Sequence, residues 1–295
     1  MNSVYNVKDA VDDRILRREH SIGSILIGAG RVSIEDSERI LKLQAEKGFR
    51  YGDAGIELGV LTAKDIRFAM ARQFEYPYLE PGDSLVSNQV MAAYEPFTQK
   101  VESLRALRSQ LMIHWLEMEG ERKTLAILSP DRGEGRSWLA ANLAVVFSQL
   151  GERTLLIDAD LRNSTQRSMF GISGKQGLAE ILLGRASFTE VIQRVPALLD
   201  LSIITAGAPP PNPQEVLARR EFEGLLNAVR DSYDVIIIDT PAATQCADGQ
   251  LIASRAGSSL FVARLGSSRT KHLQRNIEML LEAHIDIVGT VLLEH

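Results

Sequence analysis

The chain has 295 residues, of which 45% are hydrophobic and 24% charged, so the composition excludes a wholly disordered or fibrous protein. The formal net charge of −5 gives no overall positive field for nucleic acid, and the single cysteine, Cys246, excludes an intramolecular disulfide. No apolar run approaches the roughly 18 residues of a membrane-spanning helix, and the N-terminus lacks a secretory signal pattern. We therefore expect a cytoplasmic protein with no nucleic-acid partner.

The first 80 residues contain a tandem repeat, because residues 21–44 and 50–73 align without a gap. In each unit the pattern predicts a short helix that ends at a glycine, followed by a capping hydroxyl and a second, amphipathic helix. We therefore expect a small α-helical tandem-repeat domain over residues 1–80. The matched pairs are Gly23 with Gly52, Gly30 with Gly59, and Ser33 with Thr62.

A turn-rich segment, residues 81–95, follows and is interpreted as a linker. From residue 96 onward, short apolar runs alternate with longer helical patterns. Apolar strands spaced by helices are typical of a doubly wound parallel sheet with both faces covered, so we expect an α/β domain over residues 96–295. The expected strands are Leu125–Leu128, Leu155–Ile157, Leu201–Ile204, Val235–Ile238, Leu260–Val262 and Ile287–Leu292.

A glycine-rich turn, residues 129–137, follows the first expected strand and precedes a helical pattern. Glycines at such a turn allow backbone N–H groups to converge on a phosphate, and the helix dipole adds to the attraction. A P-loop has Lys where this chain has Arg136, which keeps the charge but is bulkier, while Ser137 supplies the hydroxyl that such loops place on Mg²⁺. Taken alone, the segment also fits an ordinary glycine turn.

Acidic residues end two other expected strands, with Asp158 and Asp160 after the second strand and Asp239 after Val235–Ile238. Ligands of open parallel sheets bind at the carboxyl ends of the strands, so these residues and the glycine-rich turn should share one crevice. Carboxylates there can hold Mg²⁺ through its waters and accept a proton from a hydroxyl. The three strand ends together predict a nucleotide-phosphate site.

With these motifs, residues 96–292 resemble the bacterial tyrosine kinases of polysaccharide synthesis, the BY-kinases. Residues 129–137 match the family's Walker A element apart from Arg136, and residues 158–162 match the Walker A′ pattern D-x-D-x-R. Asp239-Thr240-Pro241 matches Walker B. The matches extend to Pro211–Leu217 and to Asp248, which correspond to two further family features.

The resemblance implies a P-loop NTPase fold with ATP and Mg²⁺ as cofactors, and it assigns roles to individual residues. Asp160 would accept the tyrosine proton, with Asp158 as the other candidate, and Arg136 would take part in catalysis. The residues implied to contact nucleotide are Gly133, Glu134, Gly135, Arg136, Ser137 and Trp138, and those implied to hold Mg²⁺ are Ser137, Asp158 and Asp239.

An upstream helical pattern carries Glu102, Arg105 and Arg108, which match the family's E-x-x-R-x-x-R motif. At this spacing the three side chains share one helix flank. In the family this flank packs on a neighbouring subunit, so the resemblance implies a ring-shaped homo-oligomer. The spacing alone also fits a solvated face with local ion pairs.

The N-terminal repeat resembles the MshEN-type domain of secretion and pilus ATPases, whose tandem units bind cyclic di-GMP. The second unit carries the pattern's Arg at position 50, whereas the first unit has Ser21 there. The resemblance implies cyclic di-GMP binding, and the alternative is a docking module. The residues involved would be Ile22, Gly23, Gly30, Arg50, Gly52, Gly59 and Gln73.

Two features depart from the BY-kinase pattern: Arg136, and the lack of a C-terminal tyrosine cluster, since none of the six tyrosines follows Tyr233. The final residues, Leu293-Glu294-His295, resemble the start of a vector-encoded tag, so we expect that a natural tail has been cut off. The related ParA and MinD ATPases carry an extra Lys near the start of the P-loop, where this chain has Asp131 and Arg132. This difference favours the kinase branch.

We therefore expect an ATP- and Mg²⁺-dependent protein-tyrosine (auto)kinase that regulates exopolysaccharide chain length or export. Its expected partner is a membrane-embedded polysaccharide co-polymerase, which would recruit it to the inner membrane. The alternatives are a catalytically weak nucleotide-binding switch and a MinD/ParA-like ATPase.

Overall fold

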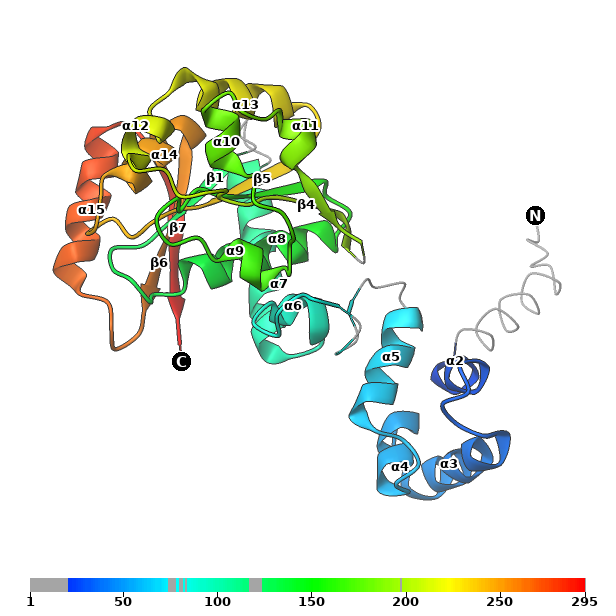
Figure 1. The fold of residues 1–295 in the computed structure, drawn as a ribbon. Coiled ribbons are helices and arrows are strands. Elements are labelled where there is room, and N and C mark those ends of the chain that lie inside the picture. The colour runs from blue at the N-terminus through cyan, green and yellow to red at the C-terminus, as the bar shows by residue number, and fades with distance from the viewer. Residues whose placement is uncertain are drawn as a thin grey trace, which may run out of the picture. The chain divides into compact units, whose positions relative to one another are not determined.

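The computed structural model describes residues 21–73, 78–79, 82, 84–116, 124–196 and 198–294. The chain forms two compact units, residues 1–77 and 78–295, which are described separately (Figure 1). The first 20 residues assigned to the helical domain lie outside the described part of the chain. 

The first unit consists of two helical hairpins built alike. A short helix in each ends just before a glycine in the left-handed region, Gly30 at φ 68° or Gly59 at φ 66°. In each repeat a hydroxyl, Ser33 or Thr62, then accepts a hydrogen bond from the backbone N–H three residues later, which satisfies one unpaired donor of the next helix. The helices are α2 (Ile22–Gly28), α3 (Ile34–Lys47), α4 (Tyr51–Glu57) and α5 (Ala63–Gln73).

The matched glycines Gly23 and Gly52 allow close packing within this unit. A Cβ at Gly23 would lie 3.2 Å from the Tyr51 ring, and a Cβ at Gly52 would lie 2.8 Å from Ile66. The pairing of Gly23 with the Tyr51 ring spans the two repeats, and the Tyr51 hydroxyl hydrogen-bonds Ser37 at 2.7 Å. Small residues at these positions therefore follow from the packing of the hairpins.

The second unit is built on a seven-stranded sheet in the order β3-β4-β2-β5-β1-β6-β7. All neighbouring strands are parallel except β3, which runs antiparallel to β4 at one edge. The expected doubly wound α/β fold is thereby confirmed. The strands are β1 (Thr124–Leu128), β2 (Thr154–Asp158), β3 (Gln193–Val195), β4 (Leu198–Ile204), β5 (Val235–Asp239), β6 (Ser258–Arg264) and β7 (Asp286–Leu293).

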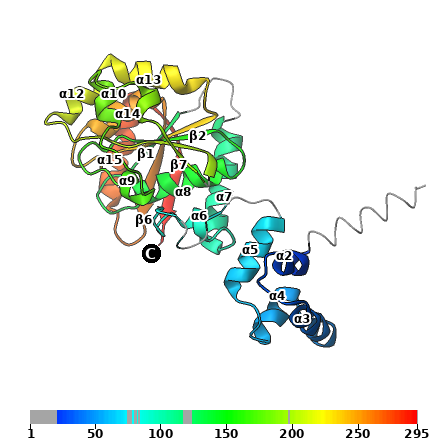
Figure 2. The same ribbon diagram turned by 45° about the vertical axis from the view of Figure 1, so that its right-hand side comes forward.

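Two hydrophobic layers cover the sheet. Helices α7 and α8 lie on one face of the sheet, and α10 and α12–α15 lie on the other (Figures 1 and 2). In β1, Leu125 and Ile127 belong to the first layer, and Ala126 and Leu128 belong to the second. Burial on both faces explains why the strands read as continuous apolar runs. The helices are α6 (Met91–Tyr94), α7 (Gln99–Leu111), α8 (Arg136–Ser148), α9 (Gln166–Met169), α10 (Leu178–Leu182), α11 (Phe188–Val191), α12 (Pro213–Leu217), α13 (Arg220–Arg230), α14 (Asp248–Ala256) and α15 (Thr270–Glu282), with a π-helical turn, η1, at Met112–Leu116.

The segment expected to be a linker belongs to the second unit, where its described residues pack on α8. Two side-chain amides, one in α8 and one at its C-cap, hold the backbone of this segment. Asn142 accepts the Ala92 N–H at 2.9 Å, and Gln149 Nε2 donates to the Ala92 carbonyl at 2.9 Å. Val86 and Val90 are buried in the same layer as α8. The apolar residues that follow the predicted turn therefore belong to this core.

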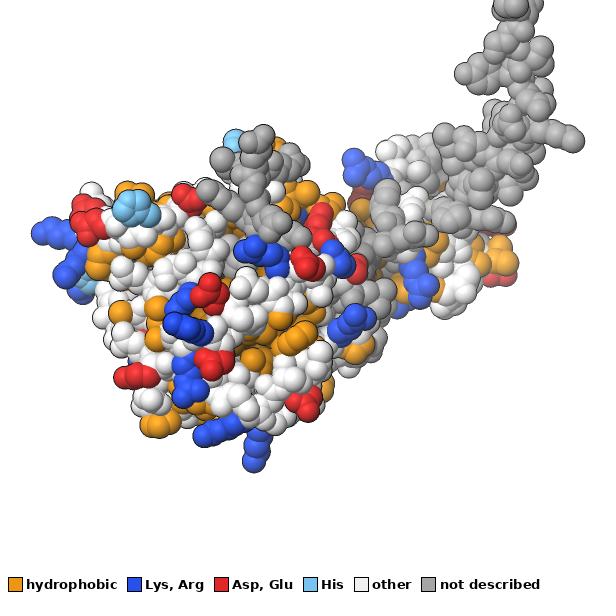
Figure 3. Space-filling model, turned by 90° about the horizontal axis from the view of Figure 1, so that it is seen from above, with side chains coloured by type: hydrophobic (Ala, Val, Ile, Leu, Met, Phe, Trp, Pro, Cys, Tyr) orange, Lys and Arg blue, Asp and Glu red, His pale blue; other side chains and the backbone are white. Residues whose placement is uncertain are grey.

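No helix in the described part of the chain is both long enough and apolar enough to cross a membrane. Figure 3 looks onto the face of the second unit that carries α10 and α13, where Lys and Arg side chains are interspersed with Asp and Glu. This face therefore carries mixed charge.

Candidate active site

The motif-bearing strand ends lie side by side in the sheet. Asp158 of β2 and Asp239 of β5 are register partners, and β5 in turn pairs with β1, which leads into the P-loop. The parallel arrangement places all three carboxyl ends at one edge, as the doubly wound topology requires. The residues that the sequence singled out for phosphate and Mg²⁺ are thus brought together.

The P-loop glycines adopt conformations that other residues rarely take. Gly133 has φ 77°, and Gly135, at the N-cap of α8, has φ 93°. A Cβ at Gly135 would also lie 2.5 Å from Leu293 Cδ1, at the end of β7. The first N–H groups of α8 have no partner within the helix by helix geometry, and such groups are suited to an anion.

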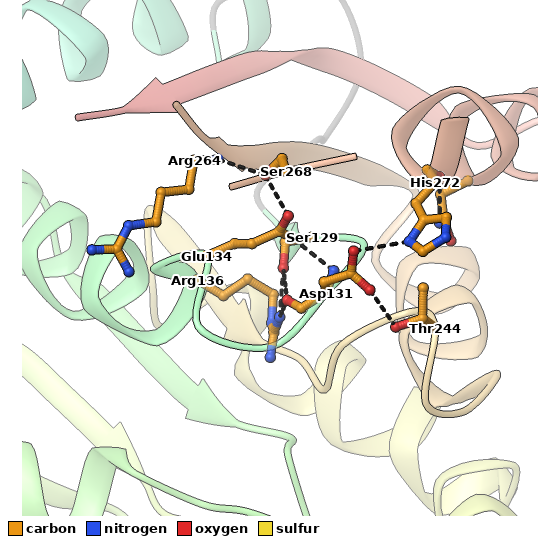
Figure 4. A network of polar contacts seen from close by, with 9 residues as sticks. Ser129, Asp131, Glu134, Arg136, Thr244, Arg264, Ser268 and His272 are labelled. Atoms are coloured by element: carbon orange, nitrogen blue, oxygen red, sulfur yellow. Dashed lines mark hydrogen bonds and ion pairs between the residues drawn. The ribbon is translucent and has the colours of Figure 1, made fainter. Parts of the chain in front are cut away.

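Arg136 is buried and ties the P-loop to the Walker B strand end. Its Nε donates to the Thr240 carbonyl at 2.7 Å. Its Nη1 donates to Ser129 Oγ at 2.5 Å and to the Asp131 carbonyl at 3.2 Å (Figure 4). Within the described residues, Nη2 makes no hydrogen bond. A guanidinium has enough donors to anchor the loop and still present one nitrogen to a phosphate.

Glu134 is buried in the loop and is also bound by protein groups. One carboxylate oxygen accepts the Asp131 N–H at 2.7 Å, and the other accepts the Ser268 hydroxyl (Figure 4). The Asp131 carboxylate lies 2.9 Å from both His272 Nδ1 and the Thr244 hydroxyl. Burial by itself would raise the pKa of Asp131, but hydrogen bonds from His272 and Thr244 outweigh it and lower that pKa. The loop is therefore braced from α15.

Asp158 and Asp160 are both buried and both accept backbone N–H groups. Asp158 Oδ2 accepts from Thr165 at 3.1 Å and from Gln166 at 3.0 Å. Asp160 Oδ1 accepts from Asn163 at 2.8 Å. Burial raises the pKa of Asp158 well above its ordinary value, and the charges of Asp239 and Asp160 raise it further, against the lowering effect of these N–H groups.

Asp239 is completely buried. Burial raises its pKa from 3.8 to about 6, against the lowering effect of the hydrogen bond from Gln166, of the nearby Ser137 hydroxyl and of the charge on Arg136. Its Oδ2 accepts from Gln166 Nε2 at 2.8 Å, while its Oδ1 has no hydrogen-bond partner among the described residues. Two adjacent buried carboxylates with raised pKa values are expected where a cation belongs.

The residues present fit Mg²⁺. The candidate ligand atoms are oxygens of carboxylates and a hydroxyl, which this ion prefers, and the unpartnered Asp239 Oδ1 is an acceptor awaiting a donor or a cation. Among the described residues, no three Asp, Glu, His or Cys side chains converge as a ready-made metal cluster. Mg²⁺ generally keeps several waters and binds through one or two carboxylates plus substrate phosphates.

A pocket of about 700 Å³ adjoins the P-loop. Trp138 lies in its wall and is half-buried, with Arg264 at the end of β6 also contributing. This volume falls within the range of small-molecule sites. The lining residues from the loop, from β7 and from the position after it are Gly133, Glu134, Gly135, Val291, Leu292, Leu293 and Glu294.

On α7, all three expected oligomer residues make contacts within their own chain. Arg105 donates to Glu102 and to the Pro96 carbonyl, and Arg108 Nη1 donates to the Val146 carbonyl at 2.6 Å. Only the Glu102 side chain is mostly exposed, at 53%. The ring interface therefore stays a prediction.

In the first unit, Arg50 is exposed at the N-cap of α4, whereas Ile22 and Gln73 are half-buried. The four glycines expected to take part in cyclic di-GMP binding are accounted for by helix packing or by left-handed helix ends. The MshEN resemblance and its ligand stay predictions.

The sequence pattern did not single out Gln166, Ser268 or His272, although all three contact residues of the site. Polar residues of these types occur throughout surface helices and loops, so nothing in their spacing marked them. Only the folded positions of α9, of α15 and of the turn before α15 bring them there.

Comparison with known proteins gives a consistent picture. The family model described as AAA domain matches residues 122–256. The tyrosine-protein kinase YwqD of Bacillus subtilis is 32% identical over 209 residues, covering 71% of this chain and 87% of that protein. The tyrosine-protein kinase Etk of Escherichia coli K12 is 35% identical over 202 residues, but the chain spans only 27% of its length.

Solved structures agree. The kinase domain of Escherichia coli ETK matches with a TM-score of 0.65 and 34% identity, covering 69% of this chain and 78% of that one. The MinD protein of Pyrococcus horikoshii, solved with Mg-ADP, matches at 22% identity and a TM-score of 0.51, which shows a shared fold. Its motifs, its sheet and these relatives together place the chain in the family of bacterial tyrosine-protein kinases.

Proposed function

We propose that this chain binds Mg²⁺·ATP at the P-loop edge and transfers the γ-phosphoryl group to tyrosine hydroxyls. The observation that carries the proposal is the meeting of the P-loop with three buried carboxylates at one sheet edge, in a chain of the tyrosine-kinase family. Phosphoryl transfer depends chiefly on positioning and on neutralising charge, which this arrangement can supply.

Each group has a task in this proposal. The N–H groups at the start of α8 and Arg136 Nη2 bind phosphate oxygens, and the pocket beside Trp138 takes the nucleoside. Ser137, Asp158 and Asp239 hold the Mg²⁺ shell, and the ion neutralises charge on the phosphates. 

Asp160 is proposed to accept the tyrosine proton, with Asp158 as the other candidate. Asp158 is fully buried and accepts three backbone N–H groups, whereas the Asp160 side chain keeps a small exposed fraction, 5% for the residue. The less enclosed carboxylate is the better placed to meet an incoming hydroxyl.

The test is phosphate transfer from radiolabelled ATP to a copolymer of glutamate and tyrosine, with phosphotyrosine as readout. We expect transfer by the wild-type chain and a loss of about 10²-fold or more in Asp160→Asn. A variant that retains full transfer would exclude Asp160 as the base. Calorimetry of Mg²⁺·ATP binding should accompany the assay, with Arg136→Lys expected within about tenfold of wild type because either side chain can supply a cation.

A nucleotide-binding switch with weak catalysis is the second candidate. The observation that favours it is the engagement of Arg136 by three protein oxygens, which anchors the cation in the loop. A nucleotide-dependent change in molecular size without phosphotyrosine would support the switch over the kinase.

The wider setting is also a proposal. We propose that the chain acts in exopolysaccharide chain-length control or export, as a ring-forming oligomer recruited to the inner membrane by a membrane-embedded co-polymerase. The motif resemblance supports this setting. A chromosomal Asp160→Asn change should alter the polymer length distribution in the source organism, and an unchanged distribution would contradict it.

Cyclic di-GMP binding by the first unit is a separate proposal. It is supported by the tandem repeat and by the exposed Arg50. Calorimetry with cyclic di-GMP should show binding that Arg50→Ala weakens, and an absence of binding by the wild type would leave docking as the role of the repeat.

A further inference from the structure

Gln166 is a fully buried amide at the carboxylate edge, at the start of α9. Its backbone N–H donates to Asp158 Oδ2 at 3.0 Å, so the residue is held against the end of β2. Its side chain extends to the P-loop and to β5. The residue therefore touches the ends of β2 and β5 and the first turn of α8, which follows the P-loop.

The orientation of the Gln166 amide follows from its partners. Nε2 lies 3.0 Å from the Ser137 carbonyl oxygen and 2.8 Å from Asp239 Oδ2, and both of those atoms are acceptors. The NH₂ group must therefore face them, and both of its hydrogens are used. The oxygen Oε1 points the other way.

Two buried acceptors in this network lack a partner. Gln166 Oε1 and Asp239 Oδ1 have no hydrogen-bond partner among the described residues. The other polar atom of each group does have one, because Gln166 Nε2 donates a hydrogen bond to Asp239 Oδ2. Buried polar atoms in native proteins are rarely left unpaired, so two such oxygens on directly bonded side chains indicate a bound species that donates hydrogen bonds or carries positive charge.

We infer that Gln166 completes the magnesium site. Nε2 fixes the Asp239 carboxylate against the P-loop at Ser137, and Oε1 accepts a hydrogen bond from water bound to Mg²⁺. Residues behind the direct ligands commonly orient them and tune metal affinity. This inference rests on the proposed nucleotide site and adds Gln166 to it as a positioning residue.

The test compares ADP binding by calorimetry in excess Mg²⁺ and in excess EDTA, using the full chain. The quantity of interest is the ratio of the two dissociation constants, which isolates the contribution of the metal. Gln166→Met keeps the side-chain length and removes both polar atoms. We expect it to reduce that ratio about 10-fold while ADP affinity in EDTA stays near the wild-type value.

Gln149→Met is the matched control. Gln149 is also a buried glutamine of the second unit, and its Nε2 binds the Ala92 carbonyl at 2.9 Å, at the far end of α8 from the P-loop. Its ratio should equal that of the wild type. An unchanged ratio in Gln166→Met, or an equal loss of affinity with and without Mg²⁺, would overturn the inference and leave Gln166 with a structural role.

If the methionine variant fails to fold, Gln166→Glu provides a second test of the inference. A third carboxylate beside Asp158 and Asp239 should lower the melting temperature of the metal-free protein and enlarge the upward shift caused by Mg²⁺·ADP. A shift no larger than that of the wild type would contradict the inference. A wild type that binds ADP in neither condition would overturn the proposed function, and the inference with it.

Discussion

The P-loop and the carboxylate edge face the same site but differ in how their polar groups are satisfied. In the P-loop, the charged ends of Glu134 and Arg136 are bonded to groups of the protein itself. At the carboxylate edge, Asp239 and Gln166 each keep a buried oxygen without a partner in the described structure. The P-loop is thus held in its conformation before a ligand binds, whereas the carboxylate edge carries more negative than positive charge.

This difference indicates how the two regions respond to a nucleotide. A preformed loop loses little conformational freedom on binding phosphate, which favours affinity. An edge with adjacent buried carboxylates is strained without a cation, because like charges and burial both oppose ionisation. Binding of Mg²⁺ should therefore stabilise the edge more than the loop.

The largest effect should come from Asp239→Asn, which removes one charge from the edge and keeps the side-chain shape. We expect Mg²⁺·ADP affinity to fall about 10- to 100-fold, and the metal-free protein to gain on the order of 2 to 3 kcal/mol in free energy of unfolding, since a buried charge is removed. Calorimetry and urea unfolding measure the two effects. A destabilised metal-free variant would show that the edge is not strained by its charge.

A related prediction concerns pH. Asp239 has a folded-state pKa of about 6 against an ordinary 3.8, so between these values the native state binds more protons than the unfolded state. The stability that this protonation contributes is fully present below pH 3.8 and is lost as the pH rises through 6. Metal-free urea midpoints measured from pH 4 to 7 should therefore include a fall that is absent in Asp239→Asn.

With saturating Mg²⁺·ADP, the contribution of Asp239 to stability should instead increase as the pH rises. The reason is that the metal binds the deprotonated carboxylate, so its affinity rises with pH. If the urea midpoints of wild type and Asp239→Asn depend on pH in the same way without metal, then the pKa of Asp239 is not raised in the folded protein.

The next effect tests the preformed loop. Gly135→Ala combines a positive φ of 93° with a contact of 2.5 Å to Leu293, whereas Gly133→Ala has a positive φ of 77° and open space around the added carbon. We expect both to destabilise the fold by about 1 kcal/mol or more from the backbone, with Gly135→Ala the more severe. Thermal melts compare the two variants.

The contact at Gly135 can be separated from its backbone conformation. Adding Leu293→Ala to Gly135→Ala should recover part of the lost stability, while adding it to Gly133→Ala should recover none. Equal recovery in both would show that Leu293 does not crowd the loop at Gly135.

The smallest effect should come from the brace between the loop and α15. His272→Ala removes a partner of Asp131 at a half-exposed position, so the expected loss of stability is at most about 1 kcal/mol. Because hydrogen bonds lower the pKa of Asp131, the contribution is present at neutral pH and is lost as the pH falls through the folded-state pKa. Urea midpoints at pH 7 and pH 3 should differ less in the variant than in the wild type.

Much of the fold followed from local pattern. The six apolar strands, the glycine-ended helices of the repeat and the helix after the P-loop were all predicted, since each depends on residues close in sequence. The antiparallel edge strand β3 and the π-helical turn η1 were not predicted. β3 has three residues and no apolar alternation, and its pairing with β4 is what makes it a strand.

The site divides in the same way. Asp158, Asp160, Asp239 and the glycines of the P-loop were found from their place at strand ends, because parallel topology brings such ends together whatever the intervening sequence. The direction of the Arg136 side chain could not be predicted, because it depends on Ser129, Asp131 and Thr240, which reach it from two strand ends.

The amino-acid sequence was sufficient to predict the family, the motif at the end of each strand and the roles of the carboxylates, since short, contiguous patterns carry this information. Folding in three dimensions was needed to show which polar atoms are paired. Gln166 becomes part of the site only because α9 packs across the ends of β2 and β5, and its unpartnered oxygen exists only because burial removes the water that would otherwise satisfy it.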